Sequence, residues 1–271
     1  MVENKNSSFD TIIIDGIKYD LCHADRIAIV SLNQHIRYNV IIPESVSYQG
    51  NNYFVTAIAD MAFHACRVVQ SITLPNTIKS IGTHAFGKCS SLETCIIPNS
   101  VEVIKDYAFC SCTSLHSLSI PQNVKKIFPF AFYGCYDLQI SVDKENSIYD
   151  SRNNCNAIIE TSTNMVYFAS KHTILPKSVT MSEESIFEIL EMSIEHIDFL
   201  EFRELNSLAY NGIRTLGQLV KLTHDDLLKH RTLKRLPITE LDEWLADKGL
   251  FFGMKNPIME NYALRFASQN F

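Results

Sequence analysis

The chain has 271 residues, 46% of them hydrophobic, and a formal net charge of −6. This length accommodates one or two domains, and the hydrophobic content is ordinary for a globular protein with a sizeable core. The acidic balance gives no whole-chain reason to expect a polyanionic partner. Most of the negative charge lies in residues 182–271, which hold 10 Lys and Arg against 15 Asp and Glu.

The N-terminal segment, residues 1–8, is polar and has no apolar core of the kind that a secretion signal contains. No apolar run in the sequence approaches the ~18 to 20 residues of a membrane-spanning helix. We therefore expect a cytoplasmic protein that does not contact a membrane. A signal-bearing sequence upstream of these residues would instead indicate the cell surface.

Short strands are predicted over residues 9–20 and 26–42, with turn residues at Asp15-Gly16. A further turn sequence, Gln49-Gly-Asn-Asn52, falls inside a first, irregular repeat that is longer than the others. Gly and Asn at such a position favour a tight turn between two strands. We expect a hairpin here that caps the N-terminal end of the structure, because terminal repeats are atypical.

A 23-residue period runs through the first half of the sequence. An Ala-Phe pair, a cysteine and an isoleucine recur at this spacing. A proline recurs at the same spacing in the regular repeats. The recurring residues are Ala62-Phe63, Ala85-Phe86, Ala108-Phe109 and Ala131-Phe132, then Cys66, Cys89, Cys112 and Cys135, then Ile58, Ile81, Ile104 and Ile127, and Pro75, Pro98 and Pro121. A fixed period of about 20 to 50 residues is typical of stacked supersecondary units, so the sequence predicts a solenoid.

Four of the eight cysteines keep this period. Neighbouring coils of a solenoid stack identical positions, so we expect a buried column of free thiols that act as small hydrophobic side chains. Cys110 and Cys112 form a C-x-C pair, but the sequence offers too few further ligands nearby for a metal site. We expect no metal, no cofactor and no small-molecule substrate.

Each regular repeat opens on a short strand that ends at a proline. Three segments share this pattern: Val69-x-x-Ile72-x-Leu74-Pro75, Leu92-x-x-Cys95-x-Ile97-Pro98 and Leu115-x-x-Leu118-x-Ile120-Pro121. Apolar residues two apart turn one strand face into the core, and proline ends the strand because it has no N–H to donate. The consensus, in register over residues 55–140, resembles the BspA-like class of leucine-rich repeats. The resemblance implies a β-solenoid of a family found in bacterial surface and host-interaction proteins.

The opposite face of these strands is the surface on which we expect a partner protein. Its outward positions are Ser71, Thr73, Thr94, Ile96, Ser117 and Ser119. Small hydroxyl side chains allow a partner to approach closely, although stacked strands often carry them without any partner. After the regular repeats, the 55 residues from Pro121 to Pro176 exceed one period, and we expect a hairpin-like insertion there.

Helical patterning begins after Thr180. Thr180 and Glu183 have the spacing of a capping box, a second helix carries Phe199, Phe202, Leu205 and Leu208 and ends at Asn211-Gly212, and Thr215 and Thr223 are placed to cap two more helices. A last helix is expected from Ile238 to Lys248. Five short helices in this stretch predict a compact all-α domain. The predicted organisation is an α+β multi-domain protein with a solenoid over residues 1–181 and a helical domain over 182–271.

Residues 195–255 resemble the C-terminal domain of the bacterial RNA polymerase alpha subunit. The matching segments include Leu200 to Leu208, Gly212 to Val220, Ile238 to Leu241 and Gly249 to Met254. The resemblance implies a small helix-hairpin-helix domain, in a family that binds promoter DNA through the minor groove and docks transcription activators.

The DNA-contacting positions of that family carry over one at a time. Its arginine and asparagine match Arg203 and Asn206, and its glutamate on the last helix matches Glu240. The hairpin departs from the pattern: the family glycine is Lys234, the next lysine is kept as Arg235, and Leu236 and Pro237 follow. Pro237 removes a backbone donor to phosphate. These cations either contact DNA or form a solvated loop, with Arg203 and Asn206 bracing neighbouring helices.

No phosphate-binding loop, dinucleotide fingerprint or H-E-x-x-H motif is present. Cys22 and His23 are adjacent, but neighbouring strand residues point to opposite faces and make a poor catalytic pair. We expect a non-enzymatic protein that binds another protein through the repeats, with the helical domain as a second docking module. The alternative is a transcription-associated protein whose helical domain binds DNA or a polymerase-docking factor.

Overall fold

The computed structural model describes residues 9–33, 35–36, 39–176, 178–181, 183–230, 232–248, 250 and 252–253. The protein divides into two compact units, Met1–Asp150 and Ser151–Phe271. The first unit holds the N-terminal strands and the repeats. The second holds a strand hairpin and the helices.

The N-terminal strands form a cap on the repeats in which both antiparallel and parallel pairing occur. In order they are β1 (Phe9–Ile14), β2 (Ile17–Cys22), β3 (Ile27–Val30), β4 (Val40–Ile41), β5 (Ser45–Tyr48) and β6 (Asn51–Ile58). β1 pairs with β2 and β2 with β3, while β5 and β6 form the predicted hairpin. Gln49 and Gly50 both have positive φ, 48° and 76°, at its turn. Glycine suits that conformation because it has no Cβ, which confirms the turn predicted at this sequence.

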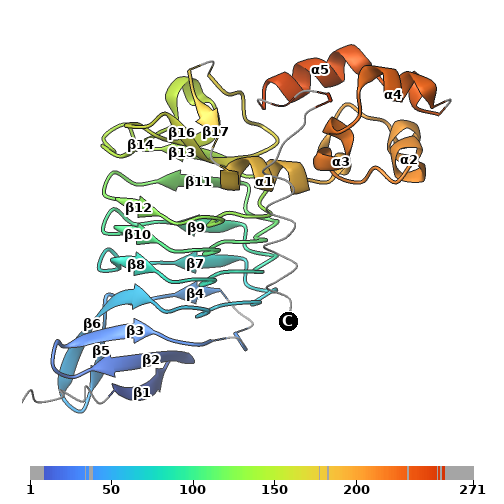
Figure 1. Ribbon diagram of the computed structural model, residues 1–271. Helices are drawn as coiled ribbons and strands as arrows, with labels where there is room; N and C mark the ends of the chain where they lie inside the picture. The colour runs from blue at the N-terminus through green and yellow to red at the C-terminus, as the bar shows by residue number, and fades with distance from the viewer. Residues whose placement is uncertain are drawn as a thin grey trace, which may run out of the picture. The chain divides into compact units, whose positions relative to one another are not determined.

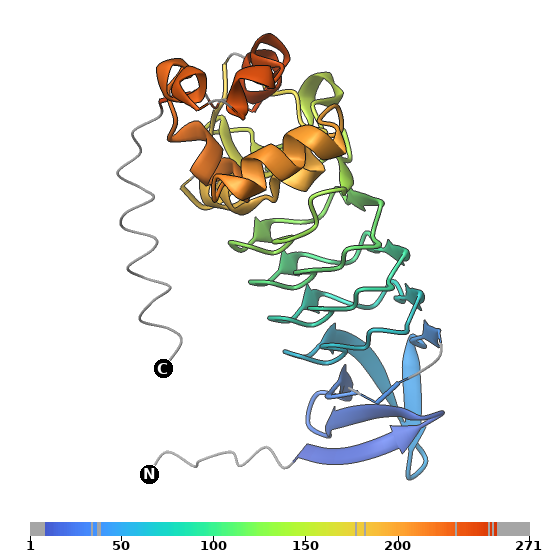
Figure 2. The ribbon, with the colours of Figure 1, turned by 90° about the vertical axis from the view of Figure 1, so that its right-hand side faces the viewer.

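The repeats stack as two columns of short parallel strands (Figure 1). The repeat strands are β7 (Ser71–Thr73), β8 (Ser80–Ile81), β9 (Thr94–Ile96), β10 (Val103–Ile104), β11 (Ser117–Ile120), β12 (Lys126–Ile127), β13 (Gln139–Val142) and β14 (Tyr149–Asp150). One sheet continues from β6 through β8 and β10 to β12. The other column contains the sheets β4-β7-β9 and β11-β13. Figure 2 shows the coils one above another, as a solenoid requires.

The recurring phenylalanines form the spine of the solenoid core. Phe63, Phe86, Phe109 and Phe132 are buried, and neighbouring rings stack with centroids 5.1 to 5.7 Å apart. The recurring cysteines line the same core, and each Sγ donates to a backbone carbonyl of an earlier coil, as Cys89 does to Phe63 O at 3.1 Å. All eight cysteines of the protein are buried free thiols. The predicted column of small hydrophobic thiols is confirmed.

A second ladder lies at the turns and is absent from the sequence prediction. Two positions in each regular repeat have positive φ, and only one of these residues is glycine: Met61, His84, Tyr107 and Phe130, then Ala65, Lys88, Ser111 and Gly134. Side chains other than glycine rarely adopt this conformation. The aromatic rings at the first of these positions stack on one another: the His84 and Tyr107 ring centroids lie 4.8 Å apart, and the Tyr107 and Phe130 ring centroids lie 5.2 Å apart.

The second unit begins with the insertion. Its elements are a 3-10 turn η1 (Arg152–Asn154) and strands β15 (Ala157–Glu160), β16 (Met165–Ala169) and β17 (Thr180–Met181). β15 and β16 pair antiparallel, which confirms the predicted hairpin, and β16 pairs parallel with β17. Thr180 therefore lies in a strand paired with Met165. It does not cap the following helix, and the capping box predicted with Glu183 was wrong.

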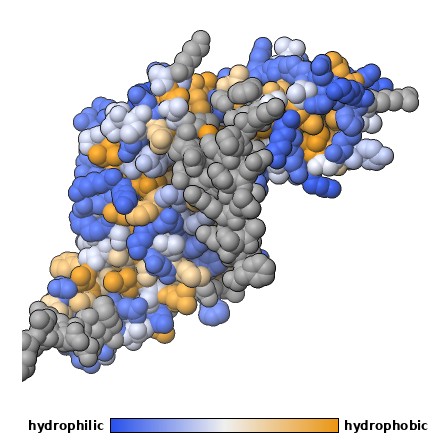
Figure 3. All heavy atoms as spheres, viewed as in Figure 1, coloured by the Kyte–Doolittle hydropathy of each residue, from blue (hydrophilic) through white to orange (hydrophobic). Residues whose placement is uncertain are grey.

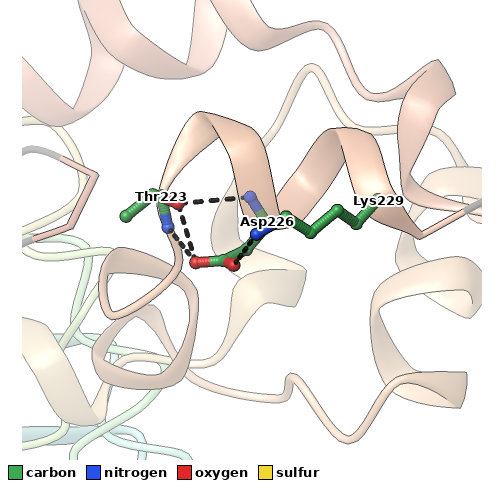
Figure 4. Close-up of polar contacts among 3 residues, drawn as sticks. All are labelled: Thr223, Asp226 and Lys229. Atoms are coloured by element: carbon green, nitrogen blue, oxygen red, sulfur yellow. Dashed lines mark hydrogen bonds and ion pairs between the residues drawn. The ribbon is translucent and has the colours of Figure 1, made fainter.

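Five short helices follow within the described residues, as predicted. They are α1 (Glu183–Glu191), α2 (Phe202–Tyr210), α3 (Leu216–Val220), α4 (His224–Lys229) and α5 (Ile238–Ala246), with 3-10 turns η2 (Ile194–His196) and η3 (Leu233–Arg235). Thr215 and Thr223 are the predicted N-caps of α3 and α4, each in a capping box. Figure 4 shows the second of these, in which Thr223 and Asp226 exchange hydrogen bonds and Lys229 reaches the same carboxylate.

Contacts within the second unit explain why its boundary lies after Asp150, whereas the sequence predicts the change of domain after Met181. The segment between carries β15 and β16, and α1 packs against β16. Leu175 N donates to Asp247 O at 2.9 Å, and Lys171 pairs with Asp198 at 2.9 Å. The insertion hairpin thus shares its packing with the helices, although it follows the repeats in sequence. Over the described ranges, the helices are all too short or too polar to cross a membrane.

Candidate functional site

The outer face of the repeat strands presents the residues that the sequence selected. Thr73, Thr94, Ile96, Ser117 and Ser119 are exposed and Ser71 is half-buried, while the alternate residues between them are buried. Strand register aligns them across the sheet: Ser71 lies opposite Thr94, Thr73 opposite Ile96, and in the next sheet Ser117 lies opposite Gln139. The structure therefore aligns the predicted positions in rows on the outer faces of the sheets β4-β7-β9 and β11-β13.

Further members of this face were not predicted from the sequence, Gln139 and the strongly exposed Ile41 among them. Ile41 in β4 lies opposite Thr73, which in turn lies opposite Ile96, so the three form one row across β4, β7 and β9. Ile41 is 74% exposed and Ile96 is 81% exposed. The signal was present, because Ile41 stands two residues before Pro43 just as Ile96 stands two residues before Pro98. The irregular length of the first repeat concealed the equivalence.

The second candidate surface is on α2. Arg203 and Asn206 line one surface hollow together with Phe202, Ser207, Tyr210 and Thr232, with a volume near 430 Å³. Phe202 lies on the predicted second helix, but its side chain points into solvent and is 82% exposed. The buried residue of that helix is Leu208, and Leu205 is half-buried. Tyr210, at 85% exposure, is a second exposed aromatic side chain on the same helix.

The remaining predicted DNA contacts lie on two other elements. Lys234 and Arg235 are exposed in η3, which packs against α2, so the cations of both elements lie in one region. Glu240 is exposed in the first turn of α5 and does not line the hollow. Pro237 stands at the N-cap of α5, where it offers no backbone N–H. The backbone donor that the resemblance implies at this position is therefore missing.

Surface colouring places the two candidate surfaces in context. In Figure 3 hydrophilic residues dominate the visible face, with hydrophobic ones scattered among them and gathered over the N-terminal strands. Exposed apolar side chains there include Ile13, Leu32 and Phe54. Single exposed apolar residues are normal on a protein surface. The exposed isoleucines of the repeats differ from such single residues because they lie in one row across the strands. The two exposed aromatic residues of α2 differ because they lie on one face of the helix.

Lys248 is excluded from the cationic surface of the helical unit. Its side chain is buried, and its Nζ lies 4.0 Å from the centroid of the Trp244 ring. Burial lowers the pKa of Lys248 to about 8, with Asp247 and Asp198 acting in the opposite direction. Among the described residues of α2 and η3, the exposed cations are Arg203 and the two of η3.

Comparisons with known proteins identify both parts of the molecule. Residues 39–162 match the family described as BspA type leucine rich repeat region, in 6 copies. Residues 181–247 match the C-terminal domain of the alpha subunit of bacterial RNA polymerase.

The curated relatives are RNA polymerase alpha subunits. The subunit of Hydrogenobaculum sp. (strain Y04AAS1) is 39% identical over 74 residues, which are 27% of this chain and 23% of the relative. That of Porphyromonas gingivalis is 43% identical over 67 residues, 25% of this chain and 20% of the relative. The matched segment spans about a quarter of the length of these curated relatives.

Solved structures similar to this protein are leucine-rich repeat proteins. One from Bacteroides ovatus is 31% identical with a TM-score of 0.42, covering 50% of this chain and 42% of the other. One from Bacteroides capillosus is 27% identical with a TM-score of 0.44, covering 49% of this chain and 98% of the other. By the two family matches, the fold is that of a BspA-type leucine-rich repeat solenoid followed by a helical domain of the RNA polymerase alpha C-terminal type.

Proposed function

We propose that this protein is a non-enzymatic binding protein whose outer repeat strands dock a protein partner. The observation that carries the proposal is the row of Ile41, Thr73 and Ile96, in which two strongly exposed isoleucines flank a threonine on a parallel sheet. Parallel sheets are usually covered on both faces. Solenoids commonly use such an extended face to bind other macromolecules.

The energetics of this row favour an apolar contact. Burying an isoleucine side chain that was exposed contributes about 1.5–3 kcal/mol. Thr94, Ser117 and Ser119 are exposed on the neighbouring strands β9 and β11, and their side chains are small, so a partner backbone can approach closely. In this proposal the isoleucines supply the affinity.

The test is affinity capture from a lysate of the encoding organism with three forms of the full-length protein. These are the wild type, Ile96→Lys, and Val68→Lys as a matched control at an exposed apolar position in the turn before β7. We expect a specific partner to be recovered by the wild type and by Val68→Lys and lost with Ile96→Lys. Recovery of the same proteins by all three forms would contradict a role for this face.

A second candidate function is DNA binding by the helical domain. It is supported by the placement of Arg203 and Asn206 in one hollow, beside the cations of η3. Anisotropy of an A·T-rich duplex, measured at low and moderate salt, would test it with Arg203→Ala and with Arg214→Ala as a control at another exposed arginine. Binding that falls with salt and with Arg203→Ala, but not with Arg214→Ala, is the expected result, because each phosphate contact makes affinity salt-dependent.

A cytoplasmic location is part of both proposals. Eight buried free thiols are usual in a reducing compartment, where disulfides seldom persist. Cell fractionation with an antibody against the protein would test it. Recovery in the surface fraction would instead connect the repeats to partners outside the cell.

A further inference from the structure

The hollow on α2 has the features of a peptide-binding groove. Phe202, Asn206 and Tyr210 are four residues apart in succession, so their side chains follow one face of the helix. At ~1.5 Å of rise per residue, the two aromatic residues are about 12 Å apart along the helix axis. Exposed apolar side chains that gather on one surface mark interaction sites more often than scattered ones do.

Hydrogen bonds fix the far wall of the hollow. Asn211, at the C-cap of α2, donates from Nδ2 to Ser207 O at 2.7 Å and to Thr232 Oγ1 at 2.9 Å. Thr232 stands just before η3 and lines the hollow. The wall is thus held in place before a ligand arrives. A preorganised site loses less conformational entropy on binding and gains affinity for that reason.

The rim of the hollow is cationic and available. Arg203 lines it, and Lys234 and Arg235 lie on the adjoining η3. Within the described part of the molecule, none of these three side chains forms an ion pair with a carboxylate. Glu204, the acidic neighbour of Arg203, accepts a hydrogen bond from Glu201 N at 2.6 Å and so serves the helix cap. An acidic ligand therefore meets cations that have no partner among the described residues.

We propose that this groove binds a short acidic amphipathic segment of a partner protein. An apolar side chain of the segment inserts between Phe202 and Tyr210, and its carboxylates pair with Arg203 and the cations of η3. Aromatic and arginine side chains dominate the energetics of protein interfaces. Residues 182–271 hold 15 acidic residues against 10 basic ones, so this part of the protein repels a negatively charged ligand. A nucleic acid carries a negative charge on every nucleotide and is repelled more strongly than a short peptide with a few carboxylates.

This inference makes the helical domain a second docking module, and it competes with the DNA-binding candidate for the same hollow. It is tested on the full-length protein by fluorescence anisotropy with a fluorescein-labelled helical peptide built from Asp, Leu and Phe. Phe202→Ser and Tyr210→Ser are each expected to weaken binding about tenfold or more. Leu228→Ser, at an exposed apolar position on α4, is the matched control and leaves affinity unchanged. Arg203→Gln weakens binding and reduces its dependence on salt.

Three results would overturn the inference. One is peptide affinity that Phe202→Ser and Tyr210→Ser leave unchanged. Another is tighter binding of a single-stranded oligothymidylate through the same two residues, which would make the groove a nucleic-acid site. The third is loss of peptide binding with Ile96→Lys alone, which would place the peptide on the repeats. Retention of peptide binding by Ile96→Lys separates this groove from the repeat face, so either proposal can fail without the other.

Discussion

At the scale of single residues, the buried phenylalanines determine how firmly the coils hold together. Phe86 is fully buried and stacks on Phe63 and Phe109, with centroids at 5.7 and 5.1 Å. Phe86→Ala removes both ring contacts and leaves a cavity, so we expect it to lower the free energy of unfolding by about 3–5 kcal/mol. Urea denaturation followed by circular dichroism would measure the loss.

Phe202→Ala is the matched control for this substitution. It deletes the same side chain at a solvent-exposed position, where surface substitutions change stability by about 0.5 kcal/mol or less. Equal effects of the two substitutions would contradict the burial that the structure assigns to the phenylalanine ladder.

The paired histidines at the turns give the repeats a predicted pH dependence. Burial lowers the pKa of both His64 and His84 from 6.5, and repulsion from Lys88 adds to this, while Asp106 acts in the opposite direction on His84. The unfolded state therefore binds protons more readily than the folded state just below pH 6.5. The stability is fully present above that pH and is lost as the pH falls below it.

The measurement is the free energy of unfolding at pH 7 and pH 5.5 for the wild type and for the double variant His64→Asn with His84→Asn. The wild type is expected to lose more stability between the two pH values than the double variant does. The lowered pKa values of Asp60 and Asp226 start from 3.8, so those carboxyls act at lower pH and leave this window clear. A variant that loses as much stability as the wild type would contradict the assignment to the histidines.

Residue-level prediction from the sequence succeeded where the period was strict. The phenylalanine and cysteine ladders repeat without exception, so their burial could be inferred from stacking alone. His84, Tyr107 and Phe130 share a left-handed backbone conformation. Their residue types do not predict it, because positive φ is usually found at Gly or Asn. Phe202 followed helical spacing, but Leu208 fills the core and leaves Phe202 outside.

At the scale of elements, the caps of the short helices are the features that local sequence determines best. Thr223 accepts from Asp226 N through its side chain, and Asp226 accepts in return from Thr223. Those hydrogen bonds, with a smaller contribution from Lys229, lower the pKa of Asp226 to about 2. The same kind of local pattern gave a wrong prediction at Thr180, because this residue pairs with Met165 in a strand.

Thr223→Ala tests the cap of α4. Loss of the side-chain acceptor leaves a helix N–H without its partner, and we expect stability to fall by about 1 kcal/mol. The pKa of Asp226 should rise part of the way toward 3.8 at the same time, because the hydrogen bond from the Thr223 hydroxyl is lost while the one from the backbone N–H of residue 223 remains. Thermal unfolding and an NMR titration of the carboxyl measure the two effects. Thr223→Ser, which keeps the hydroxyl, should restore both.

At the scale of the whole molecule, the period revealed the solenoid and the helical pattern revealed the second fold, but the packing partner of residues 151–181 was not readable. That segment has no repeat signal. Which unit it packs with depends on contacts between residues far apart in sequence, such as the hydrogen bond from Leu175 to Asp247. The site residues followed the same division. The alternation of apolar residues in the strands predicted which side chains face outward. The exposure of the two aromatic side chains on α2 depends on how the helices pack and could not be predicted.

The eight cysteines yield a prediction that concerns the entire molecule. All are buried, and burial raises the pKa of Cys89 and Cys95 to about 12 and that of Cys110 and Cys112 above the ordinary value. The thiolate is the reactive form, so both access and ionisation oppose reaction in the folded state. A chromogenic disulfide reagent should therefore react slowly with the native protein and rapidly with all eight thiols after denaturation. A fast phase in the native protein would show that part of the core opens readily, and fewer than eight thiols after denaturation without reductant would show that some of them pair.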